Sequence, residues 1–333
     1  MSKTIIIAEA GVNHNGDIEI AKKLVDVAAN SGADYVKFQT FKADNLVSRF
    51  ADKADYQKRN TRSDESHHAM IQRLEIDYDM HIQLIDHCKK KNIRFLSTPF
   101  DIPSIDLLIK LKMDLLKIPS GEITNFPYLK YIGSRAKSII MSTGMATLKE
   151  VHAAMNILLE AGLQKEKLII LHCNTEYPTP MHDVNMIAML TIRDELNVNI
   201  GYSDHTLGIE APIAAVALGA NVIEKHFTLD RTFDGPDHSA SLEPGELKNM
   251  VSAIRNIEKA LGDGIKKPSN SERKNLPIAR KSIVANQKIG KGEKFTELNL
   301  TTKRPGSGVS PMQWDKYIGK VSSKNYKKDD LII

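Results

Sequence analysis

The chain has 333 residues, of which 41% are hydrophobic and 26% charged, as is typical of globular proteins with a sizeable core. Its two cysteines are too few for a disulfide framework, and no run approaches the roughly 20 apolar residues of a membrane helix. The opening MSKTIIIAEAG lacks the long apolar run and the cleavage site of a signal peptide. We therefore expect a cytoplasmic protein without a membrane segment.

The net charge of +5 is unevenly distributed along the chain. Residues 281–333 contain 11 Lys and Arg against 5 Asp and Glu, so the first 280 residues sum to about −1. A basic tail often indicates nucleic-acid binding, but this segment has no low-complexity run and no basic stripe with interleaved aromatic residues. We expect a folded basic module that faces a small anionic substrate, and no nucleic-acid partner.

Eight short runs rich in β-branched residues recur along the chain, each followed by a helical pattern. The runs are 4–11, 34–40, 93–99, 115–122, 138–144, 167–174, 198–205 and 221–227. They do not alternate with polar residues, as expected of parallel strands buried on both faces. Eight strand–helix units in order predict a (β/α)8 TIM barrel. A doubly wound sheet is the alternative, but no GxGxxG follows the first run.

The helical patterns between these runs include 17–32, 104–111, 147–162 and 211–220, and 244–262 predicts the helix that closes the barrel. The polar stretch that follows contains two prolines and little periodicity, which is typical of a linker. The rest of the chain has short strand-like pieces and many turns. The predicted division is a barrel catalytic domain (1–262), a linker (263–277) and a small β-rich domain (278–333).

Polar side chains gather where the predicted strands end, which is where TIM barrels carry their active sites. They include Glu9, Lys37, Gln39, Thr98, Lys117, Ser120, Glu122, Ser142, His172, Asn174, Tyr177, Ser203, His205, Glu224, Lys225 and His226. A single Ser or Thr at such a position usually caps a helix or forms a turn. Helix caps, however, do not require several lysines and histidines around one rim, so we predict an active site there.

Two groups in this rim indicate chemistry. Lys37 and Lys117 stand with hydroxyl groups in a cationic cradle suited to phosphate or carboxylate. His205 and His226 end neighbouring strands, which lie about 4.8 Å apart, so their imidazoles can converge on one divalent ion. Two protein ligands would leave positions open for water and substrate. The alternative is a pair of hydrogen-bonded core histidines.

At these residues the sequence resembles the bacterial sialic acid synthases, and the likeness runs through essentially the whole chain. It is carried by AEAGVNHNGD (8–17), VKFQTFKAD (36–44), STPFD (97–101), KIPSGE (117–122), STGMA (142–146), HCNTEYPTP (172–180), GYSDHT (201–206), EKHFTLD (224–230) and GPDH (235–238). The segment TTKRPGSGVSPMQWDKYIGK (301–320) is similar to the small antifreeze-like (SAF) domain of these enzymes.

This resemblance implies an N-acetylneuraminate synthase, which condenses phosphoenolpyruvate with N-acetylmannosamine and water to a nine-carbon 2-keto sugar acid and phosphate. It implies a divalent ion, Mn²⁺ or Mg²⁺, held by His205 and His226. The residues implied for phosphoenolpyruvate are Lys37, Thr98, Lys117, Ser120, Ser142, Asn174 and Ser203. Those implied for the sugar are Gln39, Phe100, Glu122, Tyr177, Asp237 and Arg304. Glu9 is the candidate to stabilise the positive centre or to move a proton.

The resemblance also implies a homodimer in which the C-terminal domain of one subunit caps the active site of the other. Arg304 would then reach the acceptor sugar of the partner's site. Within HCNTEYPTP, Asn174 and Thr175 stand side by side, and we take Asn174 as the contact to phosphate.

Several alternatives remain open at this point. Legionaminic and pseudaminic acid synthases share nearly all these motifs and accept 2,4-diacetamido-trideoxy sugars, and nothing in the sequence decides between the acceptors. A Schiff-base sialic acid lyase would use Lys117 or Lys225 without a metal. The density of titratable groups on the rim argues against a sugar-binding protein without enzymatic activity, and the many lysines of the tail argue against ice binding.

Overall fold

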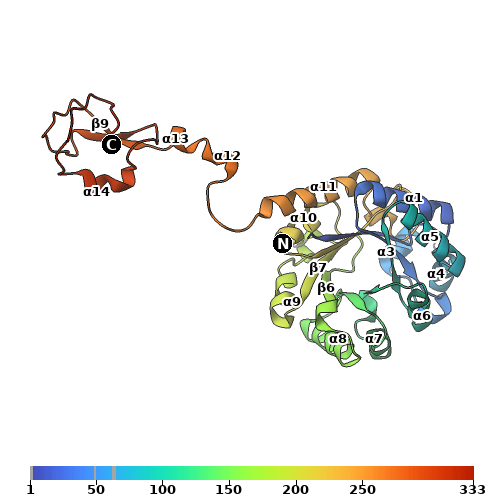
Figure 1. Cartoon of the computed structure of the whole chain (residues 1–333). Coiled ribbons are helices and arrows are strands. Elements are labelled where there is room, and N and C mark those ends of the chain that lie inside the picture. Colours follow the sequence, from blue (N-terminus) through green and yellow to red (C-terminus); the bar gives the residue numbers. More distant parts are fainter. Residues whose placement is uncertain (1–2, 49, 62–64) are drawn as a thin grey trace. The chain divides into compact units, whose positions relative to one another are not determined.

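The structure is a computed structural model that describes residues 3–48, 50–61 and 65–333. It divides into two compact units, Met1–Gly262 and Asp263–Ile333 (Figure 1). The first unit contains an eight-stranded parallel sheet and the second a two-stranded antiparallel sheet. In the described part of the chain, no helix is both long enough and apolar enough to span a membrane.

Eight parallel strands form the wall of a barrel in the first unit. They are β1 (Ile5–Gly11), β2 (Tyr35–Thr40), β3 (Arg94–Pro99), β4 (Leu115–Ile118), β5 (Ser138–Ser142), β6 (Leu168–Cys173), β7 (Asn199–Asp204) and β8 (Val222–His226). Their hydrogen-bonded order is β3-β2-β1-β8-β7-β6-β5-β4, and β3 packs beside β4. Because β1 pairs with β8, the sheet curls into a nearly closed ring. The predicted TIM barrel is confirmed, and the doubly wound alternative is wrong.

Helices cover the outside of this ring (Figure 1). They are α1 (Ile18–Ser31), α5 (Tyr78–Lys90), α6 (Ile102–Lys110), α7 (Phe126–Gly133), α8 (Leu148–Glu160), α9 (Ala188–Leu196), α10 (Glu210–Ala217) and α11 (Pro244–Leu261). The first shows why the sequence forms such a helix. The Asp17 carboxylate accepts from the backbone N–H groups of Glu19 and Ile20 in the first turn of α1, and Gly32 ends the helix at a φ of 82°. Between these caps, Leu24 and Val25 are buried toward the sheet.

Three short helices lie in the long connection between β2 and α5: α2 (Ala43–Leu46), α3 (Asp55–Asn60) and α4 (His67–Arg73). The sequence patterns do not predict them, because helices of one or two turns offer too few periodic positions. Met70 and Leu74 from this connection form a small buried cluster with Val12 and Phe41. The connection is therefore packed onto the C-terminal end of the barrel.

Alternation along the strands decides which side chains point into the barrel. A buried cluster inside the ring contains Ile7, Leu96, Ile140 and Val222, whereas Ile6, Val36 and Ile223 belong to the cluster between sheet and helices. Moving two residues along each strand keeps a side chain on the inner face. Glu9 therefore lies on the inner face next to Ile7, and Glu224 next to Val222, on the C-terminal side of this apolar cluster.

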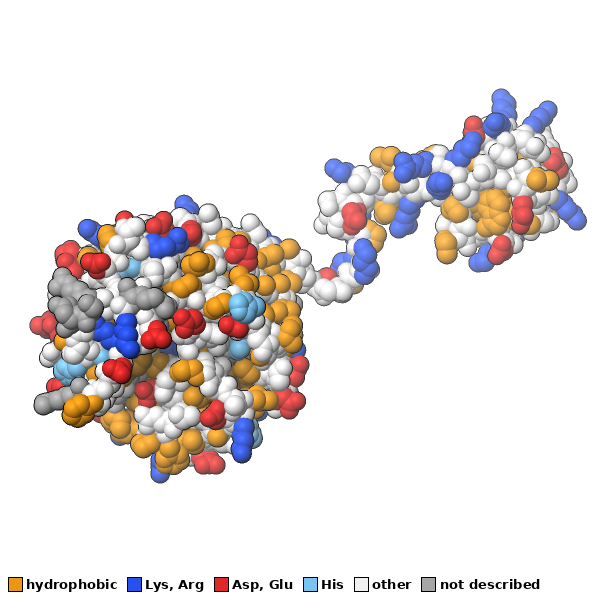
Figure 2. Space-filling view, turned by 180° about the vertical axis from the view of Figure 1, so that it is seen from behind, with side chains coloured by type: hydrophobic (Ala, Val, Ile, Leu, Met, Phe, Trp, Pro, Cys, Tyr) orange, Lys and Arg blue, Asp and Glu red, His pale blue; other side chains and the backbone are white. Residues whose placement is uncertain are grey.

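The second unit contains β9 (Ser282–Ala285), β10 (Leu300–Lys303), α12 (Asn270–Arg273), α13 (Leu276–Ala279) and α14 (Trp314–Tyr317). Its own buried cluster includes Ile283, Phe295, Leu300 and Tyr326. Lys and Arg side chains are spread over its surface (Figure 2). The predicted linker 263–277 is not wholly irregular, because it contains α12 and the start of α13; Ser269 caps α12 together with Glu272.

Five short 3₁₀ helices complete the secondary structure of the described residues. They are η1 (Ser120–Glu122), η2 (Lys165–Lys167), η3 (Met181–Asp183), η4 (His238–Ala240) and η5 (Pro311–Gln313). The first of these occupies the end of the predicted strand 115–122, since β4 stops at Ile118. η1 and η4 follow β4 and β8, so they belong to the loops at the C-terminal end of the barrel.

Candidate active site

A cavity of about 440 Å³ opens at the C-terminal ends of the barrel strands. Most of the predicted site residues line it, although they come from strands and loops far apart in the sequence. These are Glu9, Lys37, Gln39, Thr98, Phe100, Lys117, Ser120, Ser142, Tyr177, Ser203, His205, His226 and Asp237. The structure thus brings together both lysines of the predicted cradle and both histidines of the predicted metal pair.

Two barrel residues predicted to bind substrate, Asn174 and Glu122, are not part of this lining. The Asn174 side chain is turned into its own loop, where its Oδ1 accepts from the Glu176 N–H at 2.8 Å, and Thr175 lines the cavity instead. Glu122 is half-buried, and burial raises the pKa of its carboxyl. Arg304 belongs to the second unit, where it is exposed and its Nε donates to the Ala279 carbonyl at 2.9 Å.

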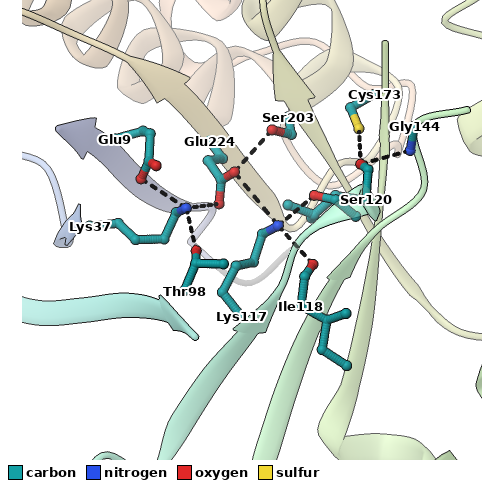
Figure 3. A network of polar contacts seen from close by, with 12 residues as sticks. Glu9, Lys37, Thr98, Lys117, Ile118, Ser120, Gly144, Cys173, Ser203 and Glu224 are labelled. Atoms are coloured by element: carbon teal, nitrogen blue, oxygen red, sulfur yellow. Dashed lines mark hydrogen bonds and ion pairs between the residues drawn. The ribbon is translucent and has the colours of Figure 1, made fainter. Parts of the chain in front are cut away.

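Lys37 anchors one half of a buried charge network at the bottom of the cavity (Figure 3). Its Nζ lies 2.8 Å from Glu9 Oε2 and donates to Thr98 Oγ1 at 2.8 Å. Glu224 Oε2 lies 3.6 Å from the same Nζ. Gln39 Nε2 donates to the other Glu9 oxygen at 3.4 Å. These contacts hold the Lys37 ammonium at the centre of the inner face of β1, β2, β3 and β8.

Lys117 anchors the other half of the same network (Figure 3). Its Nζ donates to Ser142 Oγ at 2.5 Å and to the Ile118 carbonyl at 3.1 Å, and it lies 3.7 Å from Glu224 Oε1. Ser203 Oγ donates to that same Glu224 oxygen at 3.0 Å. Glu224 therefore bridges the two lysines.

Burial and neighbouring charge give these four groups different protonation behaviour. Burial raises the pKa of Glu9 to about 7, although Lys37 opposes the shift. Burial alone would raise the pKa of Glu224, but Lys117 and Lys37 hold it below its ordinary value. Burial would lower the pKa of Lys37, but Glu224 and Glu9 raise it. For Lys117, burial prevails and lowers the pKa. Glu9 can therefore exchange a proton near neutral pH, whereas Glu224 stays ionised.

Glu224 belongs to the predicted rim, but its position between the two lysines was not predicted. The sequence does contain a signal for it, because Glu224 stands two residues before His226 on the same strand. Side chains two apart on a strand share a face, so an inward His226 implies an inward Glu224.

The two predicted metal ligands lie close together and are uncharged. The ring centroids of His205 and His226 are 5.4 Å apart, and Tyr177 stacks on His205 at 4.1 Å. The His205 Nδ1–H donates to the Asn174 carbonyl, which leaves Nε2 with its lone pair. Burial lowers the pKa of His205 to about 4 and that of His226 well below its usual range.

These features suit a divalent cation. Metal ligation requires neutral imidazole nitrogens, and His226 Nδ1 is buried without a hydrogen-bond partner. No group of three or more His, Cys, Asp or Glu side chains arranged for a metal exists among the described residues. An ion held here would therefore take two nitrogen donors from the protein, with its other positions left to water or substrate.

Gly11 allows β1 to pass close to His226. Its φ of 53° is one that residues with a side chain rarely adopt, and a Cβ there would lie 3.2 Å from His226 Cε1. The glycine of the AEAG motif thus makes room for the imidazole.

The family of the chain follows from comparison with known proteins. The model of the NeuB family matches residues 24–266, which is most of the chain. The chain belongs to the NeuB family. A SAF domain model matches residues 280–332, in the second unit. The resemblance to the sialic acid synthases drawn from the sequence motifs is confirmed.

Two curated relatives carry the same name. The N,N'-diacetyllegionaminic acid synthase of Campylobacter jejuni is 58% identical over 332 residues, which cover 100% of this chain and 99% of the relative. That of Legionella pneumophila is 47% identical and covers 96% of this chain and 90% of its own. A solved N-acetylneuraminic acid (sialic acid) synthetase from Leptospira borgpetersenii is 34% identical with a TM-score of 0.72, over 83% of this chain and 90% of that one.

Lys225 stands apart from the cavity in this NeuB-family barrel. Its Nζ lies 2.6 Å from Asp204 Oδ2 and donates to the Thr206 carbonyl, and both charged side chains are fully buried. Alternation along β8 turns Lys225 outward, because Glu224 and His226 point inward. Lys225 is therefore not placed to form the Schiff base of a lyase.

Proposed function

We propose that this NeuB-family protein is an N,N'-diacetyllegionaminic acid synthase. It would condense phosphoenolpyruvate with a 2,4-diacetamido-2,4,6-trideoxyhexose and water, and release phosphate. The observation that carries the proposal is the 58% identity over the whole chain to a synthase of that name, against 34% to a sialic acid synthetase. The sequence-based expectation of an N-acetylneuraminate synthase is thus not confirmed, and its alternative agrees better with the relatives.

In this proposal phosphoenolpyruvate binds to the charge network at the bottom of the cavity. We call this network the charged floor, and it consists of Glu9, Lys37, Lys117 and Glu224. Lys37 and Lys117 are the two buried ammonium groups that line the cavity, and the hydroxyls of Thr98 and Ser142 are already hydrogen-bonded to them. Charge-assisted contacts of this kind position phosphate and carboxylate groups. Thr175 lines the cavity where Asn174 does not, so we assign it the phosphate-side role expected of its neighbour.

Glu9 is the proposed proton-transfer group. C3 of the enol forms the new bond to the aldehyde carbon, water adds to C2, and phosphate leaves by cleavage of its bond to C2. The Glu9 carboxyl has a pKa of about 7, so near neutral pH it can take the proton that the attacking water gives up. A divalent ion on His205 and His226, Mn²⁺ or Mg²⁺, would supply Lewis acidity toward the aldehyde oxygen.

The acceptor is tested by comparing two sugars in one assay. We expect kcat/KM for the 2,4-diacetamido-trideoxyhexose to exceed that for N-acetylmannosamine by at least about 10-fold. Contacts between a pocket and one small substrate group typically change kcat/KM by this factor. Phosphate release is the readout, at saturating phosphoenolpyruvate. The stereoisomeric sugar used for pseudaminic acid serves as a control for ring configuration. A preference for N-acetylmannosamine would return the assignment to N-acetylneuraminate synthase.

We further propose a cytoplasmic homodimer in which Arg304 of one subunit completes the sugar site of the other. Support comes from the SAF domain match, the exposure of Arg304 and the basic surface of its unit. The planar guanidinium can hydrogen-bond an acetamido carbonyl or a hydroxyl pair in a way that lysine cannot.

Subunit sharing predicts complementation between two damaged variants. Arg304→Ala loses the sugar contact and His226→Ala loses the metal pair, so each homodimer is impaired at both sites. A mixed dimer has one site with an intact barrel and an intact Arg304, and activity should rise above the sum of the two variants. The measurement is turnover after confirmed subunit exchange. Activity that stays at the sum would mean that Arg304 serves its own barrel or no site at all.

A further inference from the structure

One side of the cavity carries no charge and is formed by apolar side chains. We call it the apolar wall, and it consists of Val12, Phe41, Leu46, Val47, Met70, Ile71, Leu74 and Phe100, all of which line the cavity. Met70 and Leu74 are fully buried and hold the wall in place. Leu46, Val47 and Ile71 are half-buried. This surface comes mainly from the connection with α2 to α4, not from the strands.

The apolar wall and the charged floor divide the cavity into two chemically different parts. The floor holds the Lys37–Glu9 and Lys117–Glu224 contacts on the inner faces of the strands. At the wall, His67 begins α4 and also lines the cavity, and the Asp52 backbone interacts with its ring. Its Nδ1 is buried and has no hydrogen-bond partner among the described residues. The wall thus offers an apolar surface beside the His67 imidazole.

In the proposed reaction, this division would orient the acceptor sugar. The aldehyde carbon has to reach phosphoenolpyruvate, so it lies over the charged floor and the histidine pair. The far end of the sugar, from C4 to C6, is then left to the rest of the cavity. N-acetylmannosamine carries hydroxyls at C4 and C6, and hydroxyls that lose water against an apolar surface are penalised. The diacetamido-trideoxy sugar carries an acetamido group and a methyl at these carbons, and its methyl groups gain by burial.

We propose that the apolar wall is the specificity surface of this enzyme, where Leu46, Val47 and Ile71 contact the C6 methyl and the acetamido methyl at C4. His67 Nδ1 pairs with the C4 acetamido group. This inference rests on the proposed function and names the side chains that would select its substrate. It also gives a physical reason why a sugar with fewer hydroxyls suits this cavity.

The test replaces Ile71 with serine and measures kinetics for three acceptors. Ile71→Ser removes apolar contact, so KM for the diacetamido-trideoxy sugar should rise about 10-fold or more. KM for N-acetylmannosamine should change less than that, and KM for phosphoenolpyruvate should stay the same. The third acceptor, 6-deoxy-N-acetylmannosamine, separates the C6 methyl from the C4 acetamido group. Val47→Ser is the second variant should Ile71→Ser fail to fold.

The matched control is Ile157→Ser. Ile157 is also half-buried on a helix, α8, but it packs against the barrel core and does not line the cavity. Ile157→Ser therefore shows how the loss of an apolar side chain away from the cavity affects stability. The ratio of KM for N-acetylmannosamine to KM for the diacetamido sugar should stay at its wild-type value in this variant. His67→Leu should weaken binding of the diacetamido sugar and leave 6-deoxy-N-acetylmannosamine unaffected.

The outcomes separate this inference from the proposed function. If the wild type prefers the diacetamido sugar and Ile71→Ser raises KM equally for all acceptors, or for none, the wall does not read the sugar although the function holds. If the wild type prefers N-acetylmannosamine, the proposed function fails at the first assay. A selective rise for the two 6-deoxy acceptors would establish the C6 methyl as the contact.

Discussion

His226→Ala is expected to reduce turnover by at least about 100-fold, and His205→Ala to do the same. The two rings lie with their centroids 5.4 Å apart, and both are neutral. His226 Nδ1 has no hydrogen-bond partner among the described residues, and Asp237 Oδ2 lies 3.9 Å from it. A divalent ion bound by both would lose half of its protein ligands in either variant. Activity should disappear in excess chelator and return with Mn²⁺ or Mg²⁺.

The fold should survive these substitutions, since neither ring belongs to a buried apolar cluster of the described barrel. Thermal unfolding in the presence of chelator measures this directly. Calorimetric titration with Mn²⁺ gives a readout independent of turnover, and both variants should bind the ion more weakly than the wild type.

His172→Ala is the matched control for the histidine pair. His172 lies on the neighbouring strand β6, but its Nε2 donates to the Val184 carbonyl at 2.8 Å and it does not line the cavity. Its loss should cost about 1 kcal/mol of stability and leave metal dependence intact. Full activity of the wild type after exhaustive chelation, or unchanged Mn²⁺ affinity in His226→Ala, would refute the metal assignment.

The barrel and most of the rim could be predicted from the sequence because both depend on local regularities. Buried parallel strands give apolar runs of similar length, and their C-terminal ends meet at one edge of the barrel. The alternation that turns Glu224 and His226 inward also turns Lys225 outward, so this pattern alone is enough to exclude Lys225 from a Schiff base.

Other features depend on contacts that local patterns do not encode. Asn174 and Thr175 follow β6 in an irregular loop, where no periodicity decides which side chain faces the cavity. The apolar wall is assembled from Val12, Phe41 and residues of α4 that are distant in sequence. Its short helices have few periodic positions, so the pattern did not predict this surface. Arg304 lies in the second unit, and its role rests on the family resemblance.

Lys117→Met is expected to raise KM for phosphoenolpyruvate by roughly 10- to 150-fold, the loss of one charge-assisted contact to an anion. The substitution keeps an apolar stem of similar shape up to the Cε position while removing the ammonium group. Lys117 is 2% exposed, and burial lowers the pKa of its ammonium group. A bound anion would therefore stabilise the charged form of Lys117. KM for the sugar should remain near its wild-type value, because Lys117 bonds to Ser142 on the floor and not to the wall.

Two further variants show whether this effect comes from the phosphoenolpyruvate site or from a lost ion pair. Lys225→Met breaks the buried pair with Asp204, so it should lower thermal stability by about 3–5 kcal/mol while the folded fraction keeps its affinity for phosphoenolpyruvate. Glu224→Gln removes the carboxylate between the two lysines, so binding of phosphoenolpyruvate, measured by calorimetry, should not weaken. If Lys117→Met instead raised KM for both substrates alike, Lys117 would be a structural partner of Glu224 and the phosphate cradle would have to be sought around Lys37 alone.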